Sequence, residues 1–419
     1  MQGWPFLRYV TLLGSLVIWM LLPAWGQDIP TLQELHFVES LIDLTVCPEG
    51  PPTCQFRTIQ DAVVAAPSTQ WIPPLWQEPA RLPRVLIPSG TYQENVLIVG
   101  KSIWLQAEEP GQVRLIADPS QSTPTLLAVG VISKDLAQML LVVEGLEIQA
   151  SFWGDGIQLL GTLYGLLYQT TVSGGRAGVA ALGTSGSLIL TNVTLRYNEI
   201  GLQLDRNEPD LAEGGTSLGT AAVVISQSTI EENNTGIALN ETRTEIQSSR
   251  VQHNRYYGLV SYEATMKLTD STILENTVGL FISGGQVDLV ENLIEENDIG
   301  VFIVDRGTSS PGKFTLLGNS IAHNHEEGIL LLMPSSFPAN NETPVLPEVH
   351  LLENIVWANR YGLAIPFFDP EQMGTATLEC AGNVVRENFD GDYATWDIER
   401  FDAILQPSDA LKTRCEGTS

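Results

Sequence analysis

The sequence has little positive charge. It holds 21 Lys and Arg residues against 49 Asp and Glu residues, which gives a formal net charge of −28 at pH 7. Such a surface repels nucleic acid and anionic lipid, and it is a poor match for a polyanionic polymer unless divalent cations bridge the two. We therefore expect no nucleic-acid partner, and the charge also favours solubility.

Long apolar runs are missing after the first 26 residues. Within those residues Arg8 is the only early charge, and an apolar run over residues 10–22 precedes the small residues Ala24 and Gly26. This pattern predicts a signal peptide, 1–26, because the run is shorter than the roughly 20 residues that a membrane span needs. An uncleaved anchor is the alternative. We expect a secreted, periplasmic or cell-surface protein with no stable membrane span once the signal is removed.

Cysteine is scarce, with four residues in the chain. In an exported protein four cysteines indicate disulfides, for which three connectivities exist. Loop closure favours the local pairs, Cys47 with Cys54 and Cys380 with Cys415. The pairs lie at the two ends of the chain, and neither has the Cys-x-x-Cys spacing that is typical of a zinc site.

A short repeat is what the sequence does have. Asparagine followed by glycine three or four residues later recurs, most often at intervals of 21 or 22 residues. The asparagines are Asn198, Asn233, Asn254, Asn276, Asn297, Asn324, Asn359 and Asn388. The glycines that follow are Gly201, Gly236, Gly258, Gly279, Gly300, Gly328, Gly362 and Gly391, and Gly156 and Gly178 continue the series upstream.

This period predicts an all-β solenoid, a single-stranded right-handed parallel β-helix. It is too short for two packed helices, and apolar and polar residues alternate within it, so each turn is built from short strands. Each strand should stack on its counterpart about 4.8 Å away in the next turn. The asparagines should then form a hydrogen-bonded ladder, and we expect the glycines to supply positive φ at a corner.

The N-terminal part predicts a cap for this solenoid. Five apolar residues at helical spacing indicate a short amphipathic helix that covers the open end, and strands should follow around residues 85–87, 96–99 and 103–106. The helix residues are Phe56, Ile59, Ala62, Val63 and Ala66. We expect the cap and first turns over residues 27–139, β-helix repeats over 140–392 and a C-terminal capping tail over 393–419.

The sequence resembles the pectin-lyase-like β-helix superfamily, in particular its carbohydrate-binding and sugar-hydrolase type members, among which are periplasmic copper-associated proteins. The asparagine-glycine repeat carries the resemblance, together with FRTIQDAVVAAP and the stretch RVLIPSGTYQENVLIVGKSIWLQAEEPGQVRLIA. The resemblance implies the fold. It implies no single activity, because lyases, hydrolases, epimerases, esterases and inert scaffolds share this architecture.

Catalytic signatures of such enzymes are missing. The chain has no Asp-Asp pair, no Asp-Pro-His-Asp signature and no glycine-aspartate nonapeptides. Asp155 is the nearest approach to such a signature, and one carboxylate cannot supply both the acid and the base of the usual two-carboxylate mechanism. Lys267 should stack between Glu245 and Asp288, where it could act in a lyase or simply relieve like-charge stacking. Asp155, Lys267 and Asp288 are the weak catalytic candidates.

Metal-binding candidates are also weak. Glu275 and Glu296 should occupy consecutive turns, where calcium could bridge their carboxylates, although a solvated acidic edge has the same pattern. His323 and His325 bracket a ladder asparagine and could bind copper or zinc. Calcium is the cofactor we consider, and the histidines allow a metal-associated function.

The most unusual feature is a row of outward residues two positions after each glycine. Alternation places Phe281, Phe302 and Leu330 there on three successive turns, an apolar strip of roughly 15 Å. Tyr256, Tyr257, Tyr262 and Trp357 are expected to border it. Such a strip can stack against sugar rings or dock a partner, unless a loop insertion covers it.

These features favour an exported β-helix scaffold that binds carbohydrate, a cell-surface polymer or another partner through the aromatic row. The first alternative is a polysaccharide lyase, epimerase or hydrolase whose site is built from loop insertions. The second is a periplasmic metal-associated β-helix protein.

Overall fold

The computed structural model describes residues 38–69, 80–130, 139–161, 163–183, 187–205, 222–304, 312–332, 347–365, 377–396 and 405–407. All of them belong to one compact unit, Phe37–Ser419. The predicted signal peptide, residues 1–26, lies outside these ranges. In the ranges that are described, no helix is both long enough and apolar enough to cross a membrane.

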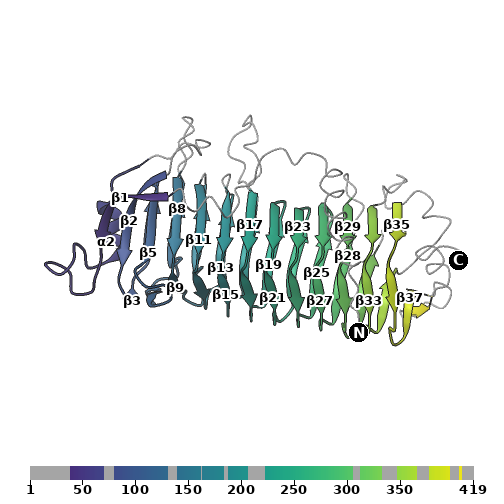
Figure 1. Ribbon diagram of the computed structural model, residues 1–419. Coiled ribbons are helices and arrows are strands. Elements are labelled where there is room, and N and C mark those ends of the chain that lie inside the picture. Colours follow the sequence, from purple (N-terminus) through teal and green to yellow (C-terminus); the bar gives the residue numbers. More distant parts are fainter. Residues whose placement is uncertain are drawn as a thin grey trace, which may run out of the picture. The chain divides into compact units, whose positions relative to one another are not determined.

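Three sheets make up the unit (Figure 1). The first sheet contains β1 (Val38–Thr45), β2 (Ala80–Ile87), β5 (Ile103–Ala107), β8 (Met139–Glu144), β11 (Leu163–Tyr168), β14 (Leu188–Thr191), β17 (Ala222–Ser226), β20 (Arg243–Gln247), β23 (Thr265–Thr269), β26 (Gln286–Val290), β29 (Lys313–Leu317), β32 (Glu348–Leu352) and β35 (Thr377–Ala381).

The second sheet contains β4 (Val96–Val99), β7 (Leu126–Val129), β10 (Ile157–Leu160), β13 (Ala177–Leu182), β16 (Ile200–Asp205), β19 (Thr235–Asn240), β22 (Tyr257–Tyr262), β25 (Val278–Ser283), β28 (Ile299–Val304), β31 (Glu327–Leu332), β34 (Tyr361–Ala364), β37 (Gly391–Trp396) and β38 (Leu405–Pro407). The third sheet contains β3 (Gly90–Gln93), β6 (Val113–Ile116), β9 (Leu146–Gln149), β12 (Thr171–Ser173), β15 (Thr194–Arg196), β18 (Thr229–Glu231), β21 (Arg250–Gln252), β24 (Thr272–Leu274), β27 (Leu293–Glu295), β30 (Ser320–Ala322), β33 (Ile355–Trp357) and β36 (Val384–Arg386).

Successive turns of the chain pair in parallel. Leu268 of β23 pairs with Leu289 of β26, and on the second sheet Leu280 of β25 pairs with Val301 of β28. Each sheet therefore takes one strand from each turn, and only β37 and β38 pair antiparallel among the described strands. This is the predicted right-handed parallel β-helix.

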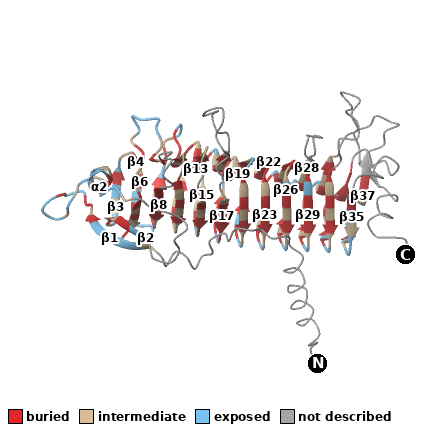
Figure 2. Ribbon diagram, turned by 90° about the horizontal axis from the view of Figure 1, so that it is seen from above, coloured by how far each residue is buried: buried red, intermediate tan, exposed pale blue. Residues whose placement is uncertain are grey.

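Apolar residues from all three strands of each turn fill the interior. One such turn contributes Leu268, Ile273 and Leu280, all with no exposed surface. Burying a side chain of this size stabilises the fold by about 1.5–3 kcal/mol. In Figure 2 the stacked strands are mostly buried or intermediate, and exposed residues gather around β1 and β2.

The N-terminal cap is the predicted helix, α2 (Ile59–Ala65), which packs Ile59, Ala62 and Val63 against the core. The solenoid satisfies both ends of this helix. The Glu94 carboxylate accepts hydrogen bonds from the first two N–H groups, each at 2.9 Å. Lys101 Nζ donates to three carbonyl oxygens at the other end, at 3.0–3.2 Å. Burial raises the pKa of Glu94.

The predicted asparagine ladder is present at the bend between the third and second sheets. Asn324 donates its backbone N–H and its Nδ2 to Asn359 Oδ1, at 3.0 and 2.8 Å. The pattern repeats from Asn198 to Asn388, and the members from Asn198 to Asn359 are at most 4% exposed. Unpaired amides at this depth would be costly, so the ladder fixes the register of the turns.

The predicted reason for the repeat glycines is wrong. Positive φ occurs at the residue before each ladder asparagine, such as Glu275 with φ 51°, and not at the following glycine. Glycine is required for space, because a Cβ on Gly279 would lie 2.6 Å from the carbonyl oxygen of Gly300. The turns approach each other too closely there for any side chain.

The last repeat glycine is out of the predicted register. Gly391 pairs with Tyr361, and the residue stacked on Gly362 is Asp392. An extra residue in the bend causes the offset. The Asp392 carboxylate then ends the ladder, because its Oδ1 accepts from the Nδ2 of Asn388 at 2.9 Å.

A second polar ladder, which the sequence analysis missed, follows the bend between the first and third sheets. Ser271 N donates to Asn292 Oδ1 at 3.0 Å, and Asn292 N donates to Asn319 Oδ1 at 3.0 Å. Its members are Ser228, Ser249, Ser271, Asn292, Asn319, Asn354 and Asn383. Each lies five residues before an asparagine of the first ladder, which is the signal that could have revealed it.

The predicted Cys47–Cys54 disulfide is present and lies between β1 and α2. Cys380, on β35, is also disulfide-bonded, while its predicted partner Cys415 lies outside the described residues. The N-terminal bond ties the edge strand to the cap.

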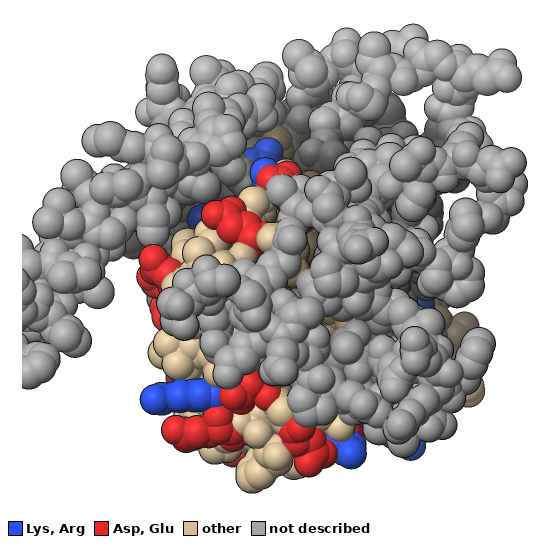
Figure 3. All heavy atoms as spheres, turned by 90° about the vertical axis from the view of Figure 1, so that its right-hand side faces the viewer, with Lys and Arg blue, Asp and Glu red and all other residues tan. Residues whose placement is uncertain are grey.

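The acidic composition is visible at the surface. In the end view of Figure 3, Asp and Glu side chains stand at several places on the described part of the surface, and Lys or Arg side chains lie beside some of them. Arg360, for example, contacts the carboxylates of Glu326 and Asp390, each at 2.6 Å.

Candidate functional site

The outward row of the second sheet has the register that alternation predicts. Val260, Phe281, Phe302 and Leu330 pair in that order on β22, β25, β28 and β31. The row continues to Ala364, whose side chain is buried. The apolar side chains of four successive turns therefore lie side by side on one outer face.

Four rings on this face form an aromatic cluster, Tyr257, Tyr262, Phe281 and Phe302. The ring centroids of Phe281 and Phe302 lie 5.3 Å apart with the planes at 90°. Tyr257 and Tyr262 contact Phe281 at 5.9 and 5.8 Å. Tyr262 is 41% exposed and the other three rings are half-buried, so the cluster is accessible from outside.

Leu330, Tyr256 and Trp357 are placed differently. Leu330 packs against the buried Tyr361 and Ala364 at the end of the row. Tyr256 is exposed at the bend before β22, with the Arg255 guanidinium 5.1 Å from its ring centroid. Trp357 belongs to the third sheet and packs on His323, with centroids 4.5 Å apart. Trp357 therefore does not border the row as expected.

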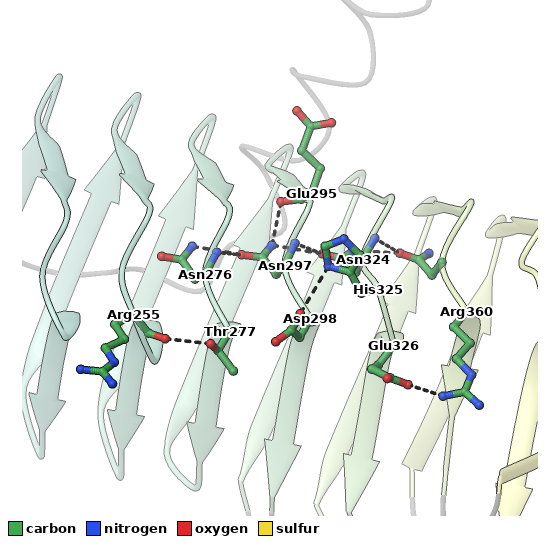
Figure 4. Close-up of polar contacts among 11 residues, drawn as sticks. Arg255, Asn276, Thr277, Glu295, Asn297, Asp298, Asn324, His325, Glu326 and Arg360 are labelled. Carbon is green, nitrogen blue, oxygen red and sulfur yellow. Dashed lines mark hydrogen bonds and ion pairs between the residues drawn. The ribbon is translucent and has the colours of Figure 1, made fainter.

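A polar row runs beside the aromatic cluster along the bend. It consists of the residues that directly follow five ladder asparagines, namely Arg255, Thr277, Asp298, His325 and Arg360 (Figure 4). His325 Nδ1 lies 3.3 Å from Asp298 Oδ1, and Thr277 Oγ1 donates to the Arg255 carbonyl at 2.7 Å. The carboxylates beside Arg360 raise the pKa of its guanidinium. This polar row offers hydrogen-bond donors and acceptors at the spacing of the strands.

The candidate base Lys267 lies on the outer face of the first sheet, away from the aromatic cluster. It pairs with Glu245 on one side and Asp288 on the other, as alternation predicts. Burial raises the pKa of Asp288, and the Thr315 hydroxyl and the lysine oppose this shift. The arrangement is a charge-compensated stack, and these contacts give it no catalytic partner.

Asp155, the remaining catalytic candidate, is a buried carboxylate that pairs with the partly exposed Arg176. Its side chain is 3% exposed, and Oδ2 lies 2.8 Å from Arg176 Nη2. Oδ1 accepts from the backbone N–H of Ala177 at 3.2 Å. Asp155 lies at the start of the second sheet's β10, so the structure does not bring it together with Lys267 and Asp288 on the first sheet.

Three of the four metal candidates have a side-chain partner of their own. Glu275 lies 2.8 Å from His253 Nε2, His323 packs on Trp357, and His325 contacts Asp298. Glu296 adopts positive φ at the bend, one turn after Glu275. Within the described ranges no group of three His, Cys, Asp or Glu residues could hold a metal ion.

Comparison with known proteins adds a family match and similar folds. Residues 141–328 match the family described as periplasmic copper-binding protein (NosD). No curated protein sequence matches the chain.

Solved structures of low sequence identity are similar to the chain. The periplasmic alginate epimerase AlgG has 11% identity and a TM-score of 0.44, covering 72% of this chain and 76% of that chain. The A-module of Azotobacter vinelandii mannuronan C-5 epimerase AlgE4 has 11% identity and a TM-score of 0.41, covering 74% and 93%. Pectate lyase Pel9A has 12% identity and a TM-score of 0.35, covering 88% and 78%. The chain's own three parallel sheets and repeating register identify the fold as a right-handed parallel β-helix.

Proposed function

We propose that this protein is an exported β-helix scaffold that binds carbohydrate on the outer face of the second sheet. The observation that carries the proposal is the aromatic cluster, whose four rings meet on a surface where a bare solenoid would place polar residues. Aromatic rings pack against the apolar faces of sugar rings, and accessible apolar patches of this kind mark binding sites.

The polar row favours a sugar over a purely apolar partner. Sugar hydroxyls need donors and acceptors close to the rings on which the sugar packs. Arg255, Asp298 and His325 supply both kinds of group from three of four successive turns. The Arg255 guanidinium forms no ion pair within the described part of the chain and packs on Tyr256, so it is available to a ligand.

Charge favours an uncharged glycan. The chain has a formal net charge of −28, and Asp298, Glu326 and Asp390 stand along the polar row or beside it. A polyanionic polymer would meet these carboxylates unless cations intervened. A neutral polysaccharide meets no such repulsion.

Export is supported by three observations of different kinds. The first 26 residues have the pattern of a signal peptide. The Cys47–Cys54 disulfide fits an oxidising compartment. The family that matches residues 141–328 is described as periplasmic.

Calorimetric titration against a panel of neutral and acidic glycans tests the proposal. The Phe281→Ser/Phe302→Ser variant should lose affinity for the bound glycan by at least about tenfold, since each ring contributes roughly 1 kcal/mol. Leu97→Ser is the matched control, because Leu97 occupies the same outward row near its other end and is 48% exposed. Absence of binding across the panel, or equal binding by both variants, would reject the proposal.

Metal handling is the second candidate, because the matching family is described as copper-binding and the matched residues include His323 and His325. Each ring already has a contact, so a metal would have to displace Trp357 or Asp298. Copper and zinc titrations of the protein and of His323→Ala/His325→Ala test this. Unchanged binding in the variant would remove the candidate.

A further inference from the structure

Two aromatic side chains stand out on the surface away from the aromatic cluster. Phe152 and Trp153, in the bend between β9 and β10, are 74% and 76% exposed. Their ring centroids lie 4.7 Å apart in an edge-to-face arrangement. Exposing two rings of this size to water is unfavourable, so a ligand that covers them gains hydrophobic free energy.

The bend holds these rings in place. Gly154 N donates to the Ser151 carbonyl at 3.0 Å, and the Gly154 carbonyl accepts from Arg176 N at 2.8 Å. A Cβ on Gly154 would lie 2.8 Å from the carbonyl oxygen of Thr123, so the backbone is closely packed against the preceding turn. The buried Asp155 carboxylate then anchors the partly exposed Arg176 side chain. The rings are therefore presented on a fixed turn, which lowers the entropic cost of binding.

This bend is continuous with the proposed binding face. Ile200 N donates to the Arg176 carbonyl, and Thr235 N donates to the Glu199 carbonyl. Tyr256 N donates to the Asn234 carbonyl in the same manner. Arg176, Glu199, Asn234 and Arg255 therefore occupy equivalent positions on successive turns, and the polar row extends back to the turn next to that of Phe152 and Trp153.

The distance between the two aromatic sites follows from the ladder. The second sheet has the order β10, β13, β16, β19, β22, β25, which gives five strand steps from the turn of Trp153 to that of Phe281. At about 4.8 Å per step the separation is roughly 24 Å along the sheet. Polar side chains fill the interval on the bend, and the outward row between the sites contains Ala180, Gln203, Ala238 and Val260.

We infer that Phe152 and Trp153 form a second aromatic subsite and that the ligand is a linear, uncharged glycan long enough to span both sites. The inference rests on the proposed carbohydrate-binding function. A chain that crosses successive strands would pack on rings at both ends and hydrogen-bond to the polar row between them. Engaging the second site is then intramolecular, so affinity rises with length.

Length-resolved titration tests this inference. The probes are linear mannan, xylan and cellulose oligomers from disaccharide to decasaccharide, titrated into the full chain. Affinity for the bound type should rise by at least about tenfold once the oligomer is long enough to bridge roughly 24 Å. In Phe152→Ser/Trp153→Ser this gain should disappear, while the affinity for the shortest bound oligomer stays unchanged.

The controls separate the possible failures. Val64→Ser, on the exposed side of α2, removes another exposed apolar side chain and should retain the gain. The subsite is rejected if Phe152→Ser/Trp153→Ser still gains affinity as the oligomer becomes longer. It is also rejected if light scattering shows that the unmodified protein is a dimer and the double variant a monomer. If no oligomer binds to the unmodified protein, the carbohydrate proposal itself has failed.

Discussion

Asn276 donates its backbone N–H and its side-chain Nδ2 to the same acceptor, Asn297 Oδ1, with both distances at 3.0 Å. One amide oxygen thus satisfies two buried donors of the preceding turn. Asn297 in turn donates to Asn324. The ladder is a chain of such paired contacts, and each member has neighbours on both sides.

Replacing Asn297 with Ala should therefore destabilise the protein strongly. The change leaves two buried donors of Asn276 without an acceptor, which costs about 3 kcal/mol or more. Urea unfolding followed by circular dichroism measures the loss. Asn234→Ala is the control, since Asn234 follows a ladder position and is only half-buried. Equal losses in the two variants would contradict a special role for the ladder.

Ser261 and Ser228 should respond in opposite ways to loss of the hydroxyl. Ser261 is fully buried and pairs with Leu239 and Ile282, and its Oγ has no hydrogen-bond partner among the described residues. Ser261→Ala should stabilise the protein by about 1 kcal/mol. Ser228 Oγ accepts from the Val193 N–H at 3.1 Å, so Ser228→Ala should destabilise it by a similar amount. Thermal melting of both variants checks the signs.

Replacing Asp288 or Asp43 with Asn should change the free energy of unfolding in a way that depends on pH, and the two dependences should have opposite signs. Burial raises the pKa of Asp288 above its usual value of 3.8, so its contribution is present at low pH and is lost as the pH rises through the folded-state pKa. Asp288→Asn should thus gain stability relative to the unmodified protein as the pH rises from about 4 towards neutrality. The measurement is urea unfolding at a series of pH values.

Asp43→Asn is the control for this experiment. The hydrogen bond from Arg84 lowers the pKa of Asp43, so its contribution is present above the usual value and is lost as the pH falls. The variant should be less stable near neutrality, and the difference should vanish in acid. If the difference in unfolding free energy between variant and unmodified protein changed with pH in the same direction for both variants, the local contacts would not set these pKa values.

Removing the Cys47–Cys54 bond should loosen the N-terminal end without abolishing the fold. The loop is short, with a sequence separation of 7, so the Cys47→Ser/Cys54→Ser variant should lose about 2 kcal/mol. Hydrogen exchange should increase in β1 and α2 and stay unchanged in β25 and β28. A uniform increase along the chain would contradict a local role.

Alternation and spacing predicted much of this structure. The inward rows, the cap helix and the outward row through Phe281 and Phe302 follow from which residues are apolar and from a repeat of nearly constant length. Two-residue periodicity decides which face a residue occupies, so the register of one turn carries over to the next.

Other features of the structure depend on contacts between turns that the repeat pattern does not reveal. Ser271 and Asn292 have the same structural role through different side chains, so a search for asparagine alone missed the second ladder. The repeat glycines are needed for contact between turns, which a sequence does not reveal. Trp357 was expected to border the outward row, but it lies on the third sheet, where a bend separates it from the aromatic cluster. The exposure of Phe152 and Trp153 likewise depends on how their bend is packed.

Asp392 stands at the C-terminal end of the first asparagine ladder, which has a different electrostatic character at each end. Each asparagine of the first ladder directs its backbone N–H and one Nδ2 donor towards the C-terminal end, so this column of aligned donors has a positive pole there, like the N-terminus of an α-helix. The carboxylate of Asp392 stands at that pole. An inserted repeat could therefore lengthen the column at an interior turn without disturbing either pole, whereas a repeat appended after Asn388 would separate the positive pole from its counter-charge.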